Sequence, residues 1–340
     1  MLRMPQFEVV KPTTVDEAVR ALHEAGENAM LVAGGTDLLP NLKHKLFTPD
    51  TVVSLADVDE LRGVRRDDDG SLVIGAMTTV DAVSKDPLVN EQAPALAQAT
   101  GLIAGPQLRR MGTLGGNVML DTRCQWYNQT YFWRKSLGFC LKKDGTECHV
   151  VAGGSKCVAA ASNDSAPTLM SLGAELEFVS SKGVETWKID DIWKADGAFN
   201  KKVAGNQLLT RIRIPAQSAG HHGAYGKLRD RGSIDYPLLG VAVRVDLGDD
   251  GAVADADVVL VALQARPVRL RKVADVLNGT RPGSDAFRQA VDDVAESAYK
   301  QCHPMPNIPG DHDYRREMVP VFTRRTLLAA VEGTGPVHHV

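Results

Sequence analysis

The stretches Val32-Ala-Gly-Gly-Thr-Asp-Leu38 and Gly112-Thr-Leu-Gly-Gly-Asn-Val118 decide the fold of this 340-residue chain. Glycines have no Cβ atom, so successive N–H groups can converge on phosphate oxygens, and Thr36 and Thr113 add hydroxyl donors. Neither stretch fits G-x-G-x-x-G, and the sequence has no G-x-x-x-x-G-K-[ST], so the Rossmann and P-loop signatures are both missing. For either stretch alone, a plain tight turn is the alternative.

The residues around the first stretch predict a βαβ unit. Phe7–Val10 and Met30–Ala33 have the composition of strands, the second of them buried, and Thr51–Leu55 closes the unit. Thr14 and Glu17 form a capping box, in which the hydroxyl and the carboxylate satisfy free amides where a helix begins. The first glycine stretch therefore follows directly after a strand.

The rest of the chain alternates strands and helices. Further strands are predicted at residues 72–76, 175–179, 208–214, 238–246 and 256–263, with helices near 267–277, 284–300 and 314–331. The stretch from Pro215 to His222 has the composition of a linker, and no third ligand at metal spacing accompanies His221 and His222. The pattern indicates an α+β or mixed α/β protein with domains at 1–57, 58–216 and 222–334.

Composition narrows the class of protein. Hydrophobic residues make up 44% and charged residues 24% of the chain, as in ordinary globular proteins, and the net charge is −3. No strong field would draw the protein onto nucleic acid or an anionic membrane. No apolar run approaches the roughly 20 residues that span a bilayer, and no signal peptide is visible. We therefore expect a cytoplasmic protein with no nucleic-acid or membrane partner.

Four of the five cysteines lie close together in the sequence, at Cys124, Cys140, Cys148 and Cys157. Their spacing, C-x15-C-x7-C-x8-C, contains no C-x2-C pair and matches neither a zinc ribbon nor a compact ferredoxin. Six aromatic residues between 126 and 139 predict a shell that excludes water from a metal centre. A [4Fe–4S] cluster, a structural zinc ion and a metal-free satellite core all fit this pattern, and Cys302 is interpreted as a structural thiol.

The two glycine stretches together resemble the flavin domain of the xanthine dehydrogenase and carbon monoxide dehydrogenase group. Further stretches follow in that family's order, namely Ser162-Asn-Asp-Ser-Ala-Pro167, Leu208-Leu-Thr-Arg-Ile-Arg-Ile-Pro215, Lys227-Leu-Arg-Asp-Arg-Gly-Ser-Ile-Asp235, Ala265-Arg-Pro-Val-Arg269 and Tyr314-Arg-Arg-Glu-Met318. The resemblance implies an α+β, two-subdomain FAD-binding fold of the vanillyl-alcohol-oxidase/PCMH type. A cysteine-bearing insertion at about 120–161 and a C-terminal α/β domain complete the expected architecture.

The resemblance also implies where FAD is bound. The expected contacts are Leu31, Val32, Ala33, Gly34, Gly35, Thr36, Asp37, Leu38, Ile103, Ala104, Leu108, Gly112, Thr113, Gly115, Gly116, Asn117, Asp164, Leu209 and Lys227. Three of these have ordinary alternatives: a turn or cap role for Asp164, a core position for Leu209 and a solvated surface position for Lys227. No catalytic triad or pair of acid–base carboxylates is marked out, which favours electron transfer by a cofactor.

Within that group, the cysteine-bearing insertion resembles the flavin subunits of 4-hydroxybenzoyl-CoA reductases. This resemblance implies that Cys124, Cys140, Cys148 and Cys157 hold a [4Fe–4S] cluster, with His149 next to a ligand but not a ligand itself. It also implies a large molybdenum (molybdopterin) subunit, a small subunit with two [2Fe–2S] clusters, a dimer of heterotrimers, and ferredoxin as donor. The reaction would be the reductive dehydroxylation of an aromatic acyl-CoA.

Two other functions remain open on the sequence. The chain fits a flavin subunit of an oxidising hydroxylase that passes electrons to NAD or oxygen, with the insertion purely structural. It also fits a non-catalytic scaffold that binds a partner through the aromatic residues of the insertion. Flavin content separates the scaffold from both enzymes, and iron content separates the two enzymes from each other.

Overall fold

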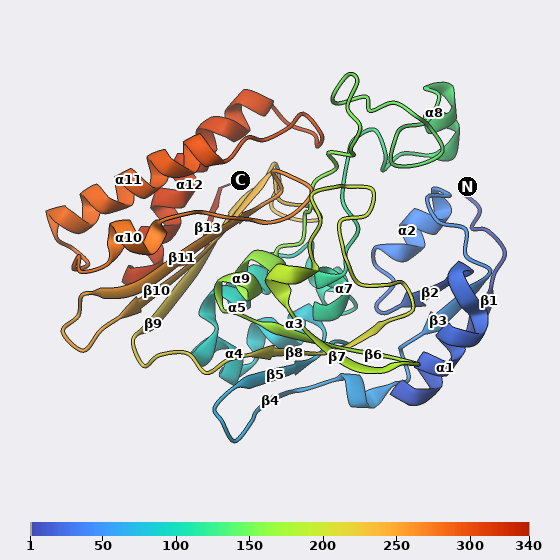
Figure 1. Cartoon of the computed structure of the whole chain (residues 1–340), viewed down its shortest axis with the longest axis horizontal. Coiled ribbons are helices and arrows are strands. Elements are labelled where there is room, and N and C mark those ends of the chain that lie inside the picture. The colour runs from blue at the N-terminus through green and yellow to red at the C-terminus, as the bar shows by residue number, and fades with distance from the viewer. Residues whose placement is uncertain (1, 340) are drawn as a thin grey trace.

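The computed structural model describes residues 2–339, and Figure 1 shows how they fold from three sheets with helices between and beside them. The N-terminal sheet is parallel, with strand order β1-β3-β2, and consists of β1 (Glu8–Val10), β2 (Ala29–Val32) and β3 (Thr51–Ser54). Helix α1 (Val15–Ala25) links the first two strands, so the predicted βαβ unit is confirmed.

The capping box at the start of α1 is present in the structure. The hydroxyl of Thr14 accepts from the backbone N–H of Glu17 at 3.2 Å, and the Glu17 carboxylate accepts from the N–H of Thr13 at 2.8 Å. The prediction that the strand before the first glycine stretch is buried was wrong. Strand β2 is only half-buried, because it forms an edge of its sheet.

The second sheet is antiparallel, with strand order β4-β5-β8-β6-β7. Its strands are β4 (Val64–Arg66), β5 (Leu72–Gly75), β6 (Glu175–Ser180), β7 (Gly183–Lys188) and β8 (Leu208–Ile214). The three predicted strands are confirmed as β5, β6 and β8. The sequence analysis missed β4 and β7, which are short or largely exposed and so carry no buried apolar pattern.

Helices pack against the second sheet and enclose its core. They are α3 (Val80–Lys85), α4 (Pro87–Gln92), α5 (Pro94–Gly101), α7 (Leu114–Val118) and α9 (Ser165–Ser171), while the short helix α6 (Pro106–Arg109) lies outside this core with no buried residue. Short 3-10 turns lie at Gly26–Asn28, Asp59–Leu61 and Ile189–Ile192. Buried apolar side chains from both the sheet and these helices, among them Ile74, Leu96 and Leu169, form one continuous core.

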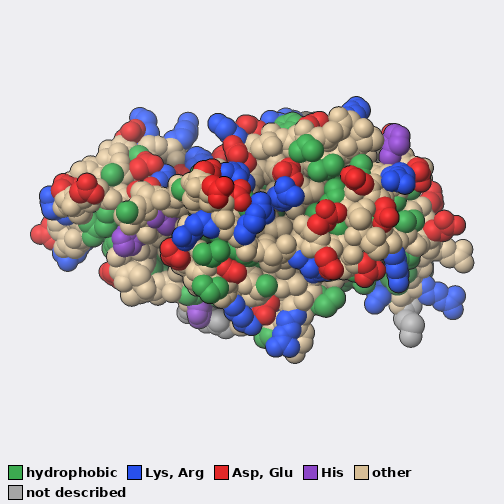
Figure 2. Space-filling view, turned by 90° about the horizontal axis from the view of Figure 1, so that it is seen from below, with side chains coloured by type: hydrophobic (Ala, Val, Ile, Leu, Met, Phe, Trp, Pro, Cys, Tyr) green, Lys and Arg blue, Asp and Glu red, His purple; other side chains and the backbone are tan. Residues whose placement is uncertain are grey.

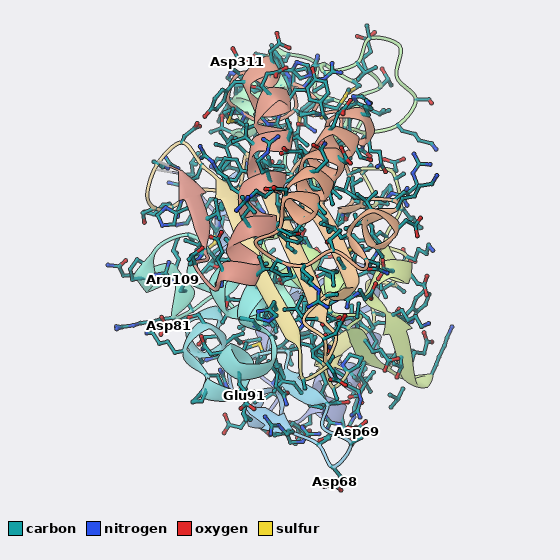
Figure 3. The ribbon with its side chains drawn as sticks, turned by 90° about the vertical axis from the view of Figure 1, so that its left-hand side faces the viewer. Asp68, Asp69, Asp81, Glu91, Arg109 and Asp311 are labelled. Atoms are coloured by element: carbon teal, nitrogen blue, oxygen red, sulfur yellow. The ribbon has the colours of Figure 1, made fainter. Side chains whose placement is uncertain are left out.

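The third sheet has strand order β12-β11-β10-β9-β13. Its strands are β9 (His221–Leu228), β10 (Leu239–Leu247), β11 (Val253–Val261), β12 (Val268–Arg269) and β13 (Val337–His339). Helices α10 (Val273–Leu277), α11 (Asp285–Gln301) and α12 (His312–Glu332) cover one face, as Figure 3 shows, with Asp311 capping α12. Side chains of α5 contact strands β9 and β10, where Ala99, Tyr225 and Ala242 form a small core of their own.

Two predictions for this region need correction. His221 and His222 do not lie in a flexible linker but begin β9, where His221 Nδ1 is 3.2 Å from Asp246 Oδ1. The helix predicted near 267–277 is helical only from Val273, because Val268–Arg269 pair with β11 as a strand.

Residues 120–161, which we call the cysteine segment, leave the body of the molecule between α7 and α9. The segment carries one short helix, α8 (Tyr131–Ser136), and projects beside α2 (Leu38–Lys43) in Figure 1. Its two ends are joined where Arg123 and Ala160 exchange backbone hydrogen bonds of 2.7 Å.

The outer surface of the described chain has two further features. Acidic and basic side chains are interspersed on the face shown in Figure 2, and neither sign dominates it. None of the helices within residues 2–339 combines the length and the apolar character that crossing a membrane would require.

Candidate functional site

The two glycine stretches lie against each other as loops at one end of the first two sheets. A Cβ atom built on Gly34 would lie 1.7 Å from the backbone oxygen of Met111, so the first loop touches the second backbone to backbone. A Cβ on Gly115 would lie 2.7 Å from the Cβ of Ala76 at the end of β5. Glycine at these two positions therefore lets the loops approach each other and the sheet.

The first glycine loop leaves backbone donors free. Within residues 2–339, the N–H groups of Gly34, Gly35 and Thr36 donate no hydrogen bond to another protein group. In the second loop, the hydroxyl of Thr113 accepts from Gly116 N at 3.1 Å where α7 begins. The N–H groups of Gly112, Leu114, Gly115 and Asn117 in the second loop donate to backbone carbonyls. The free amides of the first loop can bind the oxygens of a diphosphate, whereas those of the second loop are mostly used within the protein.

Asp37, at the end of the first loop, joins that loop to the cysteine segment. Its carboxylate accepts from the guanidinium of Arg123, from the hydroxyl of Tyr236 at 3.1 Å and from Asn41 Nδ2 at 3.0 Å. The Arg123 guanidinium also stacks on the Tyr236 ring, 4.1 Å from its centroid. Desolvation raises the pKa of Asp37 although Arg123 opposes this shift.

Asp164 and Lys227 form a buried ion pair between the second and third sheets. Lys227 Nζ lies 3.1 Å from Asp164 Oδ1 and donates to the carbonyl of Leu102 at 3.0 Å, while Tyr225 donates to Asp164 at 2.9 Å. The side chain of Lys227 is fully buried, so the solvated alternative was wrong. Asp164 makes no capping hydrogen bond to α9, which removes the cap alternative, and burial raises the pKa of this carboxyl.

The other predicted flavin residues have different surroundings in the structure. Leu209 is buried in the core of the second sheet, as its core alternative stated. Ile103 accepts from Arg109 at 2.9 Å, and Ala104 has a positive φ of 44°. The carbonyl of Leu108 accepts from Gly112 N at 2.7 Å, and the Asn117 amide oxygen accepts from Ser165 N at 3.1 Å. The flavin contacts themselves stay predictions.

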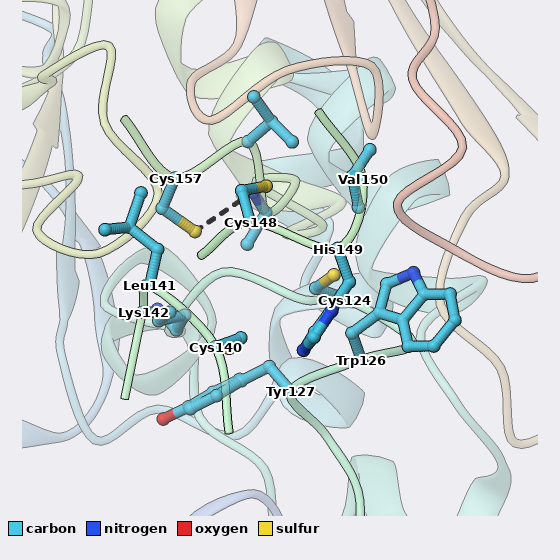
Figure 4. A pocket seen from close by; sticks show the side chains of 12 residues that line it. Cys124, Trp126, Tyr127, Cys140, Leu141, Lys142, Cys148, His149, Val150 and Cys157 are labelled. Atoms are coloured by element: carbon cyan, nitrogen blue, oxygen red, sulfur yellow. Dashed lines mark hydrogen bonds between the residues drawn. The ribbon is translucent and has the colours of Figure 1, made fainter. Parts of the chain in front are cut away.

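The four clustered cysteines line a single hollow in the cysteine segment (Figure 4). Trp126, Tyr127, Lys142 and His149 line the same hollow. Among residues 2–339, no group of three or more His, Cys, Asp or Glu side chains is arranged to hold a metal ion. The thiols therefore surround one space but do not form a ready-made metal centre.

Burial disfavours the thiolate form of two of the clustered cysteines. Desolvation raises the pKa of Cys124 to about 12 and that of Cys157 to about 11, with the neighbouring cysteines adding to the effect in both. Metal binding to cysteine requires the thiolate, so a cluster in this hollow would displace protons as it binds. Cys302 lies instead in the core of the third sheet, and burial raises its pKa to about 12.

The predicted aromatic shell is only partly present. Trp126 and Tyr127 line the hollow, and Trp126 packs at a tilt against His149 with ring centroids 5.3 Å apart. Phe132 and Trp133 are 78% and 38% exposed, so the expectation that all six rings exclude water was wrong. These side chains belong to the short helix α8, which has a free outer side because the segment projects from the body.

Several residues of the site were missed in the sequence analysis. Lys142 donates to Asp121 at 2.8 Å, Lys201 donates to the carbonyl of Leu120 at 2.7 Å, and Arg134 donates to the carbonyl of Lys45 at 3.0 Å. Lys142 could have been found from the sequence, because it lies between two of the clustered cysteines.

Comparison with known proteins covers nearly the whole chain. Residues 5–217 match the family model described as the FAD binding domain in molybdopterin dehydrogenase, and residues 223–330 match that of the CO dehydrogenase flavoprotein C-terminal domain. The carbon monoxide dehydrogenase medium chain of Afipia carboxidovorans is 30% identical over 94% of this chain and 95% of its own. The putative xanthine dehydrogenase FAD-binding subunit of Escherichia coli is 25% identical over 96% of both.

Solved structures give the same result. Carbon monoxide dehydrogenase from Hydrogenophaga pseudoflava superposes with a TM-score of 0.78 at 27% identity, covering 96% of this chain and 98% of the other. Quinoline 2-oxidoreductase from Pseudomonas putida superposes with a TM-score of 0.76 at 24% identity, covering 98% and 99%, and this likeness concerns the fold alone.

Proposed function

The chain belongs to the FAD-binding subunits of the xanthine dehydrogenase and carbon monoxide dehydrogenase family of molybdenum hydroxylases, and we propose that it relays electrons between a [4Fe–4S] cluster and FAD. The cluster would be held by Cys124, Cys140, Cys148 and Cys157, and FAD by the two glycine loops. FAD accepts and donates electrons singly or in pairs, so it can connect one-electron and two-electron partners.

One observation carries the proposal of a cluster: four thiols from a stretch of about forty residues line one hollow. Four cysteine thiolates are the usual ligand set of a [4Fe–4S] cluster. The hollow is joined to the first glycine loop through the Arg123–Asp37 ion pair. A cluster bound there would therefore be anchored directly to the flavin site.

The chain's own residues would position the two cofactors. The free amides of Gly34, Gly35 and Thr36 would donate to the diphosphate of FAD. The rings of Trp126 and Tyr127 would cover part of the cluster and limit its contact with water, which tunes its potential.

We further propose, from the cysteine segment, that the complete enzyme is of the 4-hydroxybenzoyl-CoA reductase type. Ferredoxin would then reduce this subunit, and electrons would pass through a small subunit with two [2Fe–2S] clusters to a large molybdenum subunit. The last step removes the phenolic hydroxyl of 4-hydroxybenzoyl-CoA and yields benzoyl-CoA and water. Two electrons and two protons balance that step.

The second candidate is an oxidising enzyme whose flavin passes electrons to NAD or oxygen. The names of the relatives favour it, since they are carbon monoxide and xanthine dehydrogenases and a nicotine 6-hydroxylase. In that case the cysteine segment has a purely structural role.

Iron and acid-labile sulfide per chain, measured on protein purified without oxygen, separate the two candidates. About four of each are expected for a [4Fe–4S] cluster. FAD without iron would contradict the cluster and favour the oxidising enzyme.

Cys140→Ser tests the ligand assignment directly. This variant should lose the iron and the cluster's visible absorption but retain FAD, because Cys140 contacts the hollow and not the glycine loops. Cys302→Ala, in the core of the third sheet, is the matched control and should retain both. Full iron content in Cys140→Ser would refute the assignment.

Reconstitution tests the proposed reaction. The complete complex with reduced ferredoxin should convert 4-hydroxybenzoyl-CoA to benzoyl-CoA. Failure with all cofactors loaded, together with NAD reduction in the presence of an oxidisable substrate, would establish the second candidate.

A further inference from the structure

Lys142 places a buried positive charge beside the four cysteines. Its side chain is 4% exposed and lines the hollow, in the sequence interval between Cys140 and Cys148 (Figure 4). Among the described residues that line the hollow, it is the one lysine or arginine. A charge at a buried position acts over a longer range than one in water, because the surrounding dielectric constant is lower.

Three oxygen atoms hold the ammonium group in place. Lys142 Nζ donates to Asp121 Oδ1 at 2.8 Å, to Thr122 Oγ1 at 2.8 Å and to the carbonyl of Gly197 at 2.6 Å. It also lies over the ring of Tyr127, 4.7 Å from the centroid. With three acceptors and an aromatic face around it, the charge has a fixed position relative to the cysteines.

Asp121 carries the opposite charge and is attached to the flavin side of the site. It follows α7, the helix that begins in the second glycine loop. Its carboxylate also acts on Lys201, whose ammonium donates to the carbonyl of Leu120. The Lys142–Asp121 pair therefore connects the hollow to the chain that leaves the second glycine loop.

We propose that the Lys142–Asp121 pair sets the reduction potential of the iron–sulfur cluster in the hollow relative to that of FAD. This inference rests on the proposed function, because it needs a cluster bound by the four cysteines. Reduction adds one electron to the cluster and moves no atom. The positive charge of Lys142 stabilises the added electron and raises the potential, whereas Asp121 offsets part of that effect.

The two partners therefore have opposite predicted effects. Lys142→Met keeps a side chain of similar length without the charge and should lower the midpoint potential of the cluster. Asp121→Asn leaves the lysine charge uncompensated and should raise it. We expect at least a tenfold change in the one-electron equilibrium constant for Lys142→Met, which corresponds to about 59 mV. Lys142→Arg keeps the charge and should restore most of the potential.

The experiment is a dithionite titration of the anaerobic holo-complex with redox mediators. The electron paramagnetic resonance signal of the reduced cluster reports its midpoint, and flavin absorbance reports that of FAD in the same sample. Lys143→Met is the matched control, because Lys143 is 38% exposed and pairs with Asp144 at 3.6 Å. Its cluster potential should equal that of the wild type.

The outcomes separate this proposal from the proposed function. Wild-type protein without iron would overturn both. With iron present, opposite shifts in Lys142→Met and Asp121→Asn support the proposal, and equal or same-direction shifts overturn it. If Lys142→Met loses its iron, Asp121→Asn decides alone: a raised potential supports the proposal, and an unchanged or lowered one refutes it.

Discussion

The glycine loops and the cysteine segment are neighbours in space but are held in place by different forces. The loops are fixed by backbone packing, with Gly34 against Met111 and Gly115 against Ala76. The cysteine segment has one short helix and is held by the buried or half-buried cations Arg123, Arg134 and Lys142. An added Cβ atom at Gly34 or Gly115 would therefore disrupt the first region, whereas the second region depends on its buried cations.

This difference bears on what each region requires from its ligand. The shape of the glycine loops is set by the main chain, so the free amides of Gly34, Gly35 and Thr36 are in place before any flavin is bound. In the cysteine segment, three of the four thiols are themselves part of a small core with Leu46 and Tyr127. A bound cluster would add four strong bonds to a region with little other regular structure, so its order depends more on the ligand.

Gly34→Ala should break the first region and have the largest effect. The new Cβ would lie 1.7 Å from Met111 O, and a backbone atom cannot move aside as a flexible side chain can. We expect a loss of about 3 kcal/mol or more in the free energy of unfolding, with FAD content close to zero. Chemical denaturation and flavin absorbance per chain measure both.

Gly205→Ala is the control for this prediction, because a Cβ atom added there would meet no heavy atom within 4 Å. Its stability and flavin content should match the wild type. Wild-type flavin content in Gly34→Ala would show that the two loops are not held by this contact.

Arg134→Met should loosen the second region and leave the first intact. The Arg134 side chain is 1% exposed, and it donates to the carbonyls of His44 and Lys45 at the end of α2, at 3.3 and 3.0 Å. Removing it leaves these acceptors unpaired, at a cost of about 2 kcal/mol. Faster proteolysis within the cysteine segment and a lower unfolding midpoint should follow, with FAD still bound.

Lys135→Met provides the comparison for Arg134→Met, since it removes an exposed cation from the same helix. It should digest like the wild type. Equal proteolysis rates in all three proteins would show that Arg134 does not anchor the segment.

The same contrast explains how much the sequence could predict. The capping box at Thr14 and the strands at 72–76 and 208–214 depend on local pattern, and the structure confirms them. The contacts of Arg134 with Lys45, and of Lys142 with Gly197, join residues far apart in the chain. No spacing rule encodes such pairs, so the anchors of the cysteine segment were missed.

Solvent exposure was the other property that the sequence could not supply. The aromatic residues at 126–139 were predicted to form one shell, but Phe132 extends into solvent while Trp126 faces the hollow. The motif around Lys227 left two alternatives, a solvated side chain or one bound to flavin. The structure instead buries this side chain in an ion pair with Asp164. The partner of Lys227 lies 63 residues away in the chain, so the motif around Lys227 does not reveal it.

Lys201 donates to the carbonyl of Leu120, where the chain passes from α7 into the cysteine segment. Lys201→Met tests whether this ammonium group is desolvated, and it has the smallest expected effect. Desolvation is the main reason that the pKa of Lys201 falls from 10.5 to about 8. The positive charge of Lys142 lowers this pKa further, and the negative charge of Asp121 raises it in part. Between these two pH values the unfolded chain binds the proton and the folded chain does not, so the stability of the wild type rises with pH. The variant lacks this dependence, and the lost hydrogen bond to Leu120 costs the same at every pH.

The wild type should therefore gain about 1–2 kcal/mol relative to Lys201→Met between pH 8 and pH 10, after a reduction for partial solvent exposure. Urea unfolding at both pH values measures the difference, with the exposed Lys202→Met as control. Parallel pH profiles for the wild type and Lys201→Met would show that the ammonium is not desolvated. In that case water would reach Lys201 beside Leu120, as it reaches the exposed side chains of α8.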